Sequence, residues 1–365
     1  MRARVNPFCE PGFRPPAPNP EVQAFHRSLP EYAATPLHDL AELARTLGLG
    51  SLYVKDESWR FGLNAFKGLG ASWALHRIRA QRNGPMTVAT ATEGNHGRAV
   101  AWAARQLGLE AVIFIRASAA PARIEKLRKA GATVELVEGS YDDAVRRCAV
   151  ESAAHDWQVV SDTGYPGYLE IPGWIAEGYV TLFEEVREQL EAAALPRPDV
   201  VLIQAGVGGL LHAGVAHFRA APIPPILVAV EPVAADALTS SIEAPAGEPT
   251  AARGSLDSIM AGLNCGQVSL TAWPVVRRGV ELFVTVTDPF AEAAMRQLAQ
   301  SRGADAPLIA GESGAAGLAG LLAILAAPEL AAARDFLRLG PASRVLLINT
   351  EGATDPAGYR RVVPR

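Results

Sequence analysis

The chain has 365 residues, of which 49% are hydrophobic, so it is long enough to bury a large core in about two domains. Its formal net charge of -4 leaves no basic surface, which excludes nucleic acid as an expected partner. The longest small-apolar run, Gly314 to Ala327, is shorter than the ~18–20 residues that span a bilayer, so no membrane association is expected either.

The N-terminal stretch, residues 1–20, is rich in proline and lacks the apolar region of a secretory signal. We expect a flexible arm there and a cytoplasmic location. The cysteines, Cys9, Cys148 and Cys265, are widely spaced without a CxxC pattern, and the histidines have no HExxH spacing. These patterns argue against a disulfide framework and predict no metal site.

Short apolar runs rich in β-formers alternate with helical patterns along the chain. The predicted strands are Met86 to Thr92, Ala111 to Ile115, Thr133 to Val137, Trp157 to Ser161, Val200 to Gln204, Ile226 to Glu231, Phe283 to Thr287 and Arg344 to Asn349. Because several of them are apolar on both faces, they favour parallel sheets covered by helices, an α/β fold. In such folds ligands bind beyond the carboxyl ends of the strands.

The first candidate residue is Lys67, in the apolar stretch RFGLNAFKGLGASW. Only four of the 34 cationic residues are lysines, so a lysine here indicates a task that arginine cannot perform, such as forming a Schiff base with a carbonyl carbon. The alternative is a lysine at a helix start whose stem lies on apolar surface and whose amine is in water.

The turn after Val200 to Gln204 reads AGVGGLLHAG. Its glycines let the backbone approach an anion, and free N–H groups at the following helix favour a phosphate. The pattern lacks both the third glycine of GxGxxG and the P-loop lysine, so a single phosphate monoester fits better than a dinucleotide or a nucleoside triphosphate. The alternative is a turn that needs glycine for tight packing only.

Three other strand ends carry polar side chains. The turn at 92–96, TEGNH, can bind a carboxylate through Thr92, Gly94 and His96, while Asn95 either bonds a ring hydroxyl or caps a helix. Asp162 can bind an ammonium or form a turn, and Thr350 is a neutral hydroxyl or a turn residue. An amine, a phosphate cradle and these groups together match the needs of pyridoxal 5'-phosphate and an amino-acid substrate.

The segments KDESWRFGLNAFKGLGA, ATEGNHGRAVAWAA, SDTGYPGYLEIPGWIAEGY, SIMAGLNCG, AGESGAAGL and INTEG resemble the motif series of the diaminopropionate ammonia-lyases. These belong to the fold-type II pyridoxal-phosphate enzymes, which are tryptophan synthase beta-like. The resemblance runs from about residue 35 to 355 in the family's order. It implies two domains, each with a mainly parallel sheet flanked by helices: residues 1–68 with 172–365, and residues 69–171, with the active site in the cleft between them.

The resemblance also implies roles for individual residues. Lys67 is the lysine that holds the cofactor, Phe66 lies against its ring, and Asn95 bonds the ring hydroxyl. The phosphate loop is Gly206, Val207, Gly208, Gly209 and Leu210, and Thr350 faces the pyridine nitrogen. Glu93 stands where the family has an aspartate that acts as a base for the D-isomer, and Asp162 matches the aspartate near the substrate's side-chain amine.

The implied reaction is α,β-elimination of 2,3-diaminopropionate to pyruvate and two ammonia, with Lys67, Glu93 and Asp162 as catalytic residues. Because glutamate replaces aspartate at position 93, we expect the L-isomer to be the better substrate. Apolar neighbours are expected to depress the pKa of Lys67 so that it can act as a base. The alternative is a threonine, serine or hydroxyaspartate dehydratase of the same fold, and family members are commonly homodimers.

Overall fold

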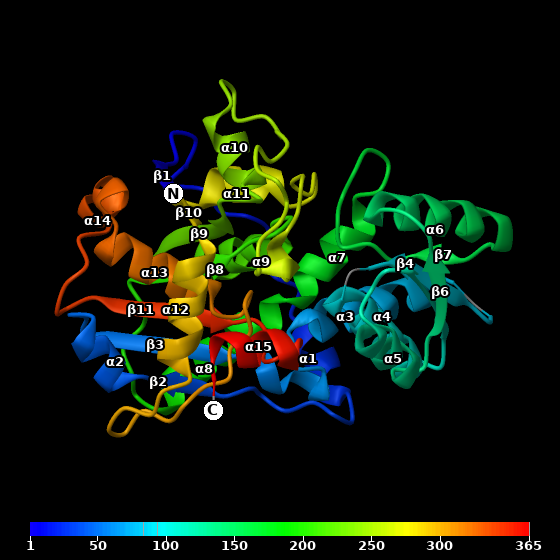
Figure 1. The fold of residues 1–365 in the computed structure, drawn as a ribbon, viewed down its shortest axis with the longest axis horizontal. Helices are drawn as coiled ribbons and strands as arrows, with labels where there is room; N and C mark the ends of the chain where they lie inside the picture. Colours follow the sequence, from blue (N-terminus) through cyan, green and yellow to red (C-terminus); the bar gives the residue numbers. More distant parts are fainter. Residues whose placement is uncertain (83, 93, 365) are drawn as a thin grey trace.

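The computed structural model describes residues 1–82, 84–92 and 94–364. Within this part of the chain the strands form two sheets, with the orders β1-β10-β9-β8-β11-β3-β2 and β6-β5-β4-β7. Figure 1 shows the seven-stranded sheet on the left and the four-stranded sheet on the right. The strands are β1 (Arg2–Val5), β2 (Leu37–Asp39), β3 (Ser51–Asp56), β4 (Thr87–Ala91), β5 (Glu110–Arg116), β6 (Thr133–Val137), β7 (Gln158–Val159), β8 (Val200–Gln204), β9 (Ile226–Pro232), β10 (Leu282–Val286) and β11 (Arg344–Asn349).

Helices cover both faces of the large sheet and flank the small one (Figure 1). The α-helices are α1 (Glu21–Ser28), α2 (Ala41–Thr46), α3 (Lys67–Gln81), α4 (Asn95–Gln106), α5 (Pro121–Lys129), α6 (Tyr141–His155), α7 (Glu170–Gly178), α8 (Val180–Ala192), α9 (Gly209–Phe218), α10 (Ala237–Glu243), α11 (Trp273–Gly279), α12 (Asp288–Leu298), α13 (Ala316–Ala326), α14 (Ala331–Leu337) and α15 (Pro356–Val362). Three short 3-10 helices are η1 (Glu57–Gly62), η2 (Ala261–Leu263) and η3 (Pro328–Leu330).

The predicted α/β class is confirmed, because every strand expected from the sequence is present and the inner strands of both sheets pair in parallel. Strands β8, β10 and β11 are buried almost throughout, as their continuous apolar runs predict. The strand predicted at Trp157 to Ser161 is shorter, Gln158–Val159. Val160 still donates its N–H to the carbonyl of Ala89, after which the chain turns toward Asp162.

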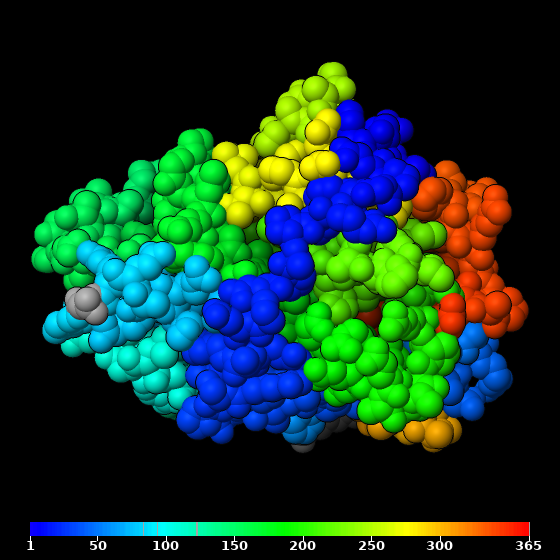
Figure 2. Space-filling view, turned by 180° about the vertical axis from the view of Figure 1, so that it is seen from behind, coloured from blue at the N-terminus to red at the C-terminus, as the bar shows by residue number. Residues whose placement is uncertain are grey.

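The prediction of a flexible N-terminal arm is wrong. Residues Arg2–Val5 form β1, which pairs antiparallel with β10 at the edge of the large sheet. Asn6 then donates from Nδ2 to the carbonyl oxygens of Arg277 and Val280, and the ring of Phe13 is 8% exposed. Figure 2 shows this segment in blue, packed over the surface of the large sheet's helices. The proline-rich stretch is held by specific bonds that its composition does not reveal.

The apolar run at the C-terminal side forms the buried helix α13, as predicted. Among the described residues no single helix is long and apolar enough to cross a membrane. The segments Ala316–Ala326 and Pro328–Leu337 together have the length and apolar composition of a membrane span, but they are bent by 93° relative to each other.

Candidate active site

Lys67 and Asp162 form the centre of the candidate site. Lys67 is the first residue of α3, and its Nζ donates to Asp162 Oδ2 at 2.6 Å. Each side chain is 22% exposed, so the pair lies mostly out of water. The Nζ atom is 5.3 Å from the ring centroid of Phe66 and 6.0 Å from that of Tyr179. The fold therefore brings together a residue at a helix start and a residue after a strand that are 95 positions apart in the chain.

The charge state of this pair differs from the sequence-based expectation. Burial alone would lower the pKa of Lys67, but the Asp162 carboxylate outweighs burial, so the pKa is raised. Burial would likewise raise the pKa of Asp162, and Lys67 and His96 lower it well below its usual range. Apolar neighbours thus do not depress the pKa of Lys67 in this arrangement, and the amine is protonated while Asp162 faces it.

His96 lies on the other side of Asp162. Its Nε2 is 2.8 Å from the carbonyl oxygen of Val160, and its Nδ1 is 3.8 Å from Asp162 Oδ2. Burial lowers the pKa of His96, so at neutral pH Nε2 carries the proton and donates it to the carbonyl. Nδ1 is then a buried acceptor without a hydrogen-bond partner in the described part of the chain. Such an atom can receive an N–H or O–H from a bound molecule.

In the polar turn before α4, Asn95 does not act as the helix cap that its position in the sequence allows. Thr92 Oγ1 accepts from the N–H groups of Gly94, at 3.0 Å, and Gly97, at 3.1 Å, so it shapes the turn. Gly94 is the N-cap, and the Asn95 side chain does not cap the helix but donates from Nδ2 to Glu351 Oε2. The predicted catalytic residue Glu93 lies outside the described residues.

The glycine loop connects β8 to α9. Gly208 has φ +100°, a conformation that favours glycine, and it stands as the N-cap of α9. A Cβ atom on Gly206 would be 2.8 Å from Cys265 Sγ, so a side chain there would collide with its neighbour. The N–H groups of Gly206 and Gly208 have no acceptor among the described residues. Free N–H groups at a helix start form a cradle for a phosphate.

Thr350 follows β11, which lies between β8 and β3 in the large sheet. Its carbonyl accepts from the N–H of Phe66 at 3.1 Å, and its Oγ1 accepts from Gln204 Nε2 at 3.0 Å. Gln204 is the last residue of β8, just before the glycine loop. Since its oxygen already accepts a bond, the Thr350 hydroxyl keeps its proton available for an acceptor such as an unprotonated ring nitrogen.

Other side chains at the site were missed by the sequence reasoning. Tyr179 packs on Phe66 with ring centroids 4.7 Å apart, and its hydroxyl is buried without a partner in the described part of the chain. Burial raises the pKa of the Cys265 thiol to about 12, so it is a neutral neighbour of the glycine loop. Burial also raises the pKa of Glu351. The segments SIMAGLNCG, IAEGY and INTEG carry these residues, but only the fold shows that they meet.

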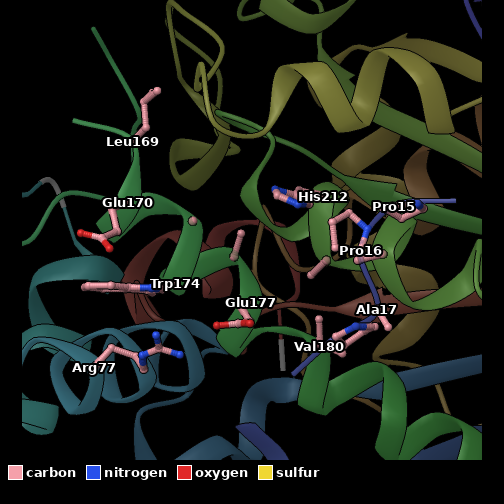
Figure 3. A pocket seen from close by; sticks show the side chains of 15 residues that line it. Pro15, Pro16, Ala17, Arg77, Leu169, Glu170, Trp174, Glu177, Val180 and His212 are labelled. Carbon is pink, nitrogen blue, oxygen red and sulfur yellow. The ribbon is translucent and has the colours of Figure 1, made fainter. Parts of the chain in front are cut away.

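A separate cavity of about 370 Å³ lies between the segment Pro15 to Pro18, α7 and α9. Figure 3 shows His212 and Glu177 directed toward it, with Trp174 on the side of Arg77. Neither Lys67, Asp162 nor the glycine loop up to Leu210 lines this cavity. It is therefore not part of the candidate active site.

Comparison with known proteins agrees with this geometry. Residues 29–351 match the family model described as "Pyridoxal-phosphate dependent enzyme". The chain is 41% identical to a diaminopropionate ammonia-lyase of Salmonella typhimurium, over 94% of this chain and 91% of that protein. A mouse L-serine dehydratase/L-threonine deaminase is 31% identical over 49% of this chain and 51% of that protein.

A solved structure of the diaminopropionate ammonia-lyase of Escherichia coli, in complex with an aminoacrylate-PLP azomethine reaction intermediate, superimposes with a TM-score of 0.91 at 36% identity. The match covers 99% of this chain and 96% of that one. The dehydratase relative thus shares about half of the chain, whereas the ammonia-lyases share nearly all of it. The chain belongs to the pyridoxal-phosphate-dependent enzyme family, with the fold-type II architecture.

Proposed function

We propose that the chain is a pyridoxal-phosphate-dependent carbon-nitrogen lyase that converts 2,3-diaminopropionate and water to pyruvate and two ammonia. The observation that carries this proposal is the Lys67 to Asp162 ion pair, with 2.6 Å between Nζ and Oδ2. It places a carboxylate that is ionised at neutral pH beside the amine that would hold the cofactor. The similarity to the ammonia-lyases over nearly the whole chain supports the same reaction.

The residues present fit the cofactor. The Gly206 to Leu210 loop, which includes Val207, would hold the phosphate through its free N–H groups, and the Lys67 amine would hold the cofactor covalently. Phe66, Asn95 and Thr350 would contact the ring, its hydroxyl and its nitrogen, respectively. When bound, pyridoxal 5'-phosphate would draw electron density from the substrate's Cα and so ease loss of the Cα proton.

Asp162 would select the substrate by exchanging one ammonium partner for another. 2,3-Diaminopropionate carries a side-chain amine, which as an ammonium can take the place of Lys67 at the Asp162 carboxylate. Lys67 then loses the partner that raises its pKa, and burial, which acts in the opposite direction, favours its neutral form. A neutral Lys67 Nζ can accept the Cα proton, after which the Cβ–N bond breaks and ammonia leaves.

His96 and the turn at residues 92–96 would orient the substrate. The free Nδ1 of His96 faces Asp162 from 3.8 Å and can accept an N–H of the same substrate amine. The turn that contains Thr92 and Gly94 would bind the substrate carboxylate at the start of α4. Asn95 and Glu351, which are bonded to each other, would anchor this turn to the end of β11.

The dehydratase alternative is disfavoured by the same ion pair. A β-hydroxyl group is neutral and cannot replace an ammonium at Asp162, so Lys67 would stay protonated when a hydroxy amino acid is bound. The test is product release from the cofactor-loaded protein with L- and D-2,3-diaminopropionate, L-serine and L-threonine, the last scored as 2-oxobutyrate. Turnover of diaminopropionate above both hydroxy amino acids is expected. Turnover of the hydroxy amino acids alone would make the chain a dehydratase.

The role of Asp162 has its own test. We expect Asp162→Asn to lower kcat/KM for diaminopropionate by about 10²-fold or more, because an amide cannot pair with the second ammonium. The slow turnover of L-serine should change much less. A matched loss for both substrates would show that Asp162 acts only through the position of Lys67.

The proposal includes three further points. The L-isomer is expected to react faster than the D-isomer because of Glu93, which lies outside the described residues. The domain division into residues 1–68 with 172–365 and residues 69–171 would set the active site between the two sheets. We further propose a cytoplasmic homodimer, which size-exclusion chromatography with light scattering would test.

A further inference from the structure

A second cavity lies away from the candidate active site, between η1, α4 and α5. Its volume is about 690 Å³, within the range of small-molecule sites, and neither Lys67 nor Asp162 lines it. The wall from α4 includes Arg98 and Arg105, and the wall from α5 includes Lys126. One side therefore belongs to the helices of the small sheet and the other to the 3-10 helix that follows β3.

Four cations line this cavity, and among them only Lys129 pairs with a carboxylate of the described chain, that of Glu125 at 3.8 Å. Arg98 donates from Nη2 to the carbonyl of Leu63, and Lys126 Nζ donates to the carbonyl of Thr354 at 2.6 Å. The Arg105 side chain makes no hydrogen bond or ion pair with any residue that the structure describes. The acidic residue in the lining, Glu31, already accepts a bond from Trp102 Nε1 at 2.8 Å. The lining therefore carries four positive charges and one negative charge, and Arg98, Arg105 and Lys126 make no ion pair with a described carboxylate.

Two of these cations have lowered pKa values, both mainly because of burial, and a neighbouring positive charge adds to the effect at Lys126. Burial lowers the pKa of Arg98, which Glu351 only partly offsets. Burial also lowers the pKa of Lys126, and the neighbouring Arg98 acts in the same direction. A bound anion would relieve this repulsion because it would supply the missing opposite charge.

The aromatic part of the cavity is Trp59, in η1. Its side chain is 69% exposed, which is unusual for the largest apolar residue type. The indole is nevertheless fixed, because Nε1 donates to Asp56 Oδ2 at 3.1 Å. Asp56 is itself 2% exposed and accepts from Asn349 Nδ2 at 2.7 Å. An exposed ring held in place by a buried carboxylate offers a preformed surface for stacking.

We propose that this cavity binds a small organic anion that carries a planar ring, with Arg98, Arg105 and Lys126 around the anionic group and Trp59 against the ring. Phosphate and carboxylate are the groups that guanidinium and ammonium side chains recognise, and the fixed indole adds selectivity for an aromatic body. The site is distinct from the catalytic one and goes beyond the proposed function.

Isothermal titration calorimetry of the cofactor-loaded protein tests this with phenyl phosphate, inorganic phosphate and phenol. We expect one phenyl phosphate per chain beyond the resident cofactor, bound more tightly than either inorganic phosphate or phenol. Arg105→Gln should raise the dissociation constant of phenyl phosphate about tenfold, since it removes one charge-assisted contact. Trp59→Ala should weaken phenyl phosphate but leave inorganic phosphate unchanged.

The matched control is Arg128→Gln. Arg128 is also exposed and lies in α5, but it does not line the cavity, so its removal should leave phenyl phosphate affinity unchanged. Unfolding midpoints of all variants show whether they are folded. Equal affinities for Arg105→Gln and Arg128→Gln, or phenyl phosphate bound no tighter than inorganic phosphate, would overturn the proposal.

Discussion

Two lysines of this chain have carboxylate partners at the same distance yet differ in every other respect. Lys67 Nζ is 2.6 Å from Asp162 Oδ2, and Lys55 Nζ is 2.6 Å from Glu185 Oε2. Lys55 and Glu185 are fully buried, whereas the side chains of the other pair are each 22% exposed. The length of the ion pair therefore does not separate Lys55 from Lys67, the proposed cofactor lysine.

The hydrogen bonds of the Lys55 ammonium are all made within the protein. Besides Glu185, its ammonium donates to the carbonyl of Thr35 at 2.7 Å and to Gln189 Oε1 at 2.9 Å, so all three protons are used. Glu185 also receives two bonds from Arg60. Such a network has no capacity to accept a ligand, and it ties β3 to α8.

The polar groups around Lys67 do not make all the hydrogen bonds they could. Asp162 is its one acceptor in the described part of the chain, while the Nδ1 of His96 and the hydroxyl of Tyr179 nearby have no partners. Histidines repeat the contrast, because both nitrogens of the buried His26 are bonded, to Thr181 and to the carbonyl of Leu69. In these two comparisons, the residues of the candidate active site keep unused hydrogen-bonding capacity, whereas Lys55 and His26 do not.

The largest effect is expected for Lys67→Ala. Loss of the amine should lower pyruvate formation by about 10⁴-fold or more and abolish the absorbance of covalently held cofactor. Borohydride reduction of the wild type followed by peptide mapping should label Lys67. A label on Lys55 instead would reverse the comparison between the two lysines.

Lys55→Met should act on stability instead. Removing the ammonium leaves Glu185 buried with one cation fewer, which costs about 3–5 kcal/mol in the free energy of unfolding. Denaturant unfolding measures this, and kcat of the folded protein should remain near that of the wild type. A variant with unchanged stability but low kcat would mean that the two lysines are not separable in function.

The histidine contrast predicts the pH dependence of stability. Burial lowers the pKa of His26 to about 3, although its bond to Leu69 acts in the opposite direction. The unfolded chain therefore binds a proton near pH 6.5 that the folded chain does not bind until pH about 3. Stability should fall as the pH is lowered through this window, by about 1.4 kcal/mol per unit from this residue. His26→Asn should show a shallower slope of the unfolding midpoint against pH, and an unchanged slope would contradict the assignment.

The smallest effect is expected for Tyr179→Phe. Its hydroxyl is buried without a partner, so its removal should change the free energy of unfolding by about 1 kcal/mol or less, in the stabilising direction. If the hydroxyl contacts substrate, kcat/KM will fall by about tenfold at the same time. A destabilised but fully active variant would place Tyr179 with the structural groups.

Sequence reasoning reached most of the fold because its evidence is local. Strands such as Val200–Gln204 are apolar on both faces, and the rule that ligands bind at strand ends then pointed to Asp162 and Thr350. Lys67 was found because lysine is rare in this chain. The strands β1, β2 and β3 were not predicted. The edge strands β1 and β2 are short and only partly buried, whereas β3 is an inner, buried strand that ends in the charged residues Lys55 and Asp56.

The charge state of Lys67 was out of reach for the same reason. The residues next to Lys67 in the sequence are apolar and predict a depressed pKa. The residue that raises its pKa is Asp162, which follows β7 of the four-stranded sheet and is distant in the sequence. Tyr179 and Cys265 were likewise recognisable only as members of motifs. Residues whose role depends on distant partners need the tertiary structure to be identified.

The order of the strands also bears on how the chain is made by the ribosome. The small sheet uses consecutive strands, β4 to β7, so all of its strands have been synthesised once the chain reaches residue 159. In the large sheet β11, which is the last strand in the chain, lies between β8 and β3. In the nascent chain, the edges of β3 and β8 that pair with β11 therefore stay unpaired until residues 344–349 have been synthesised. Co-translational folding of this protein is expected to begin in its middle and to finish at its C-terminus.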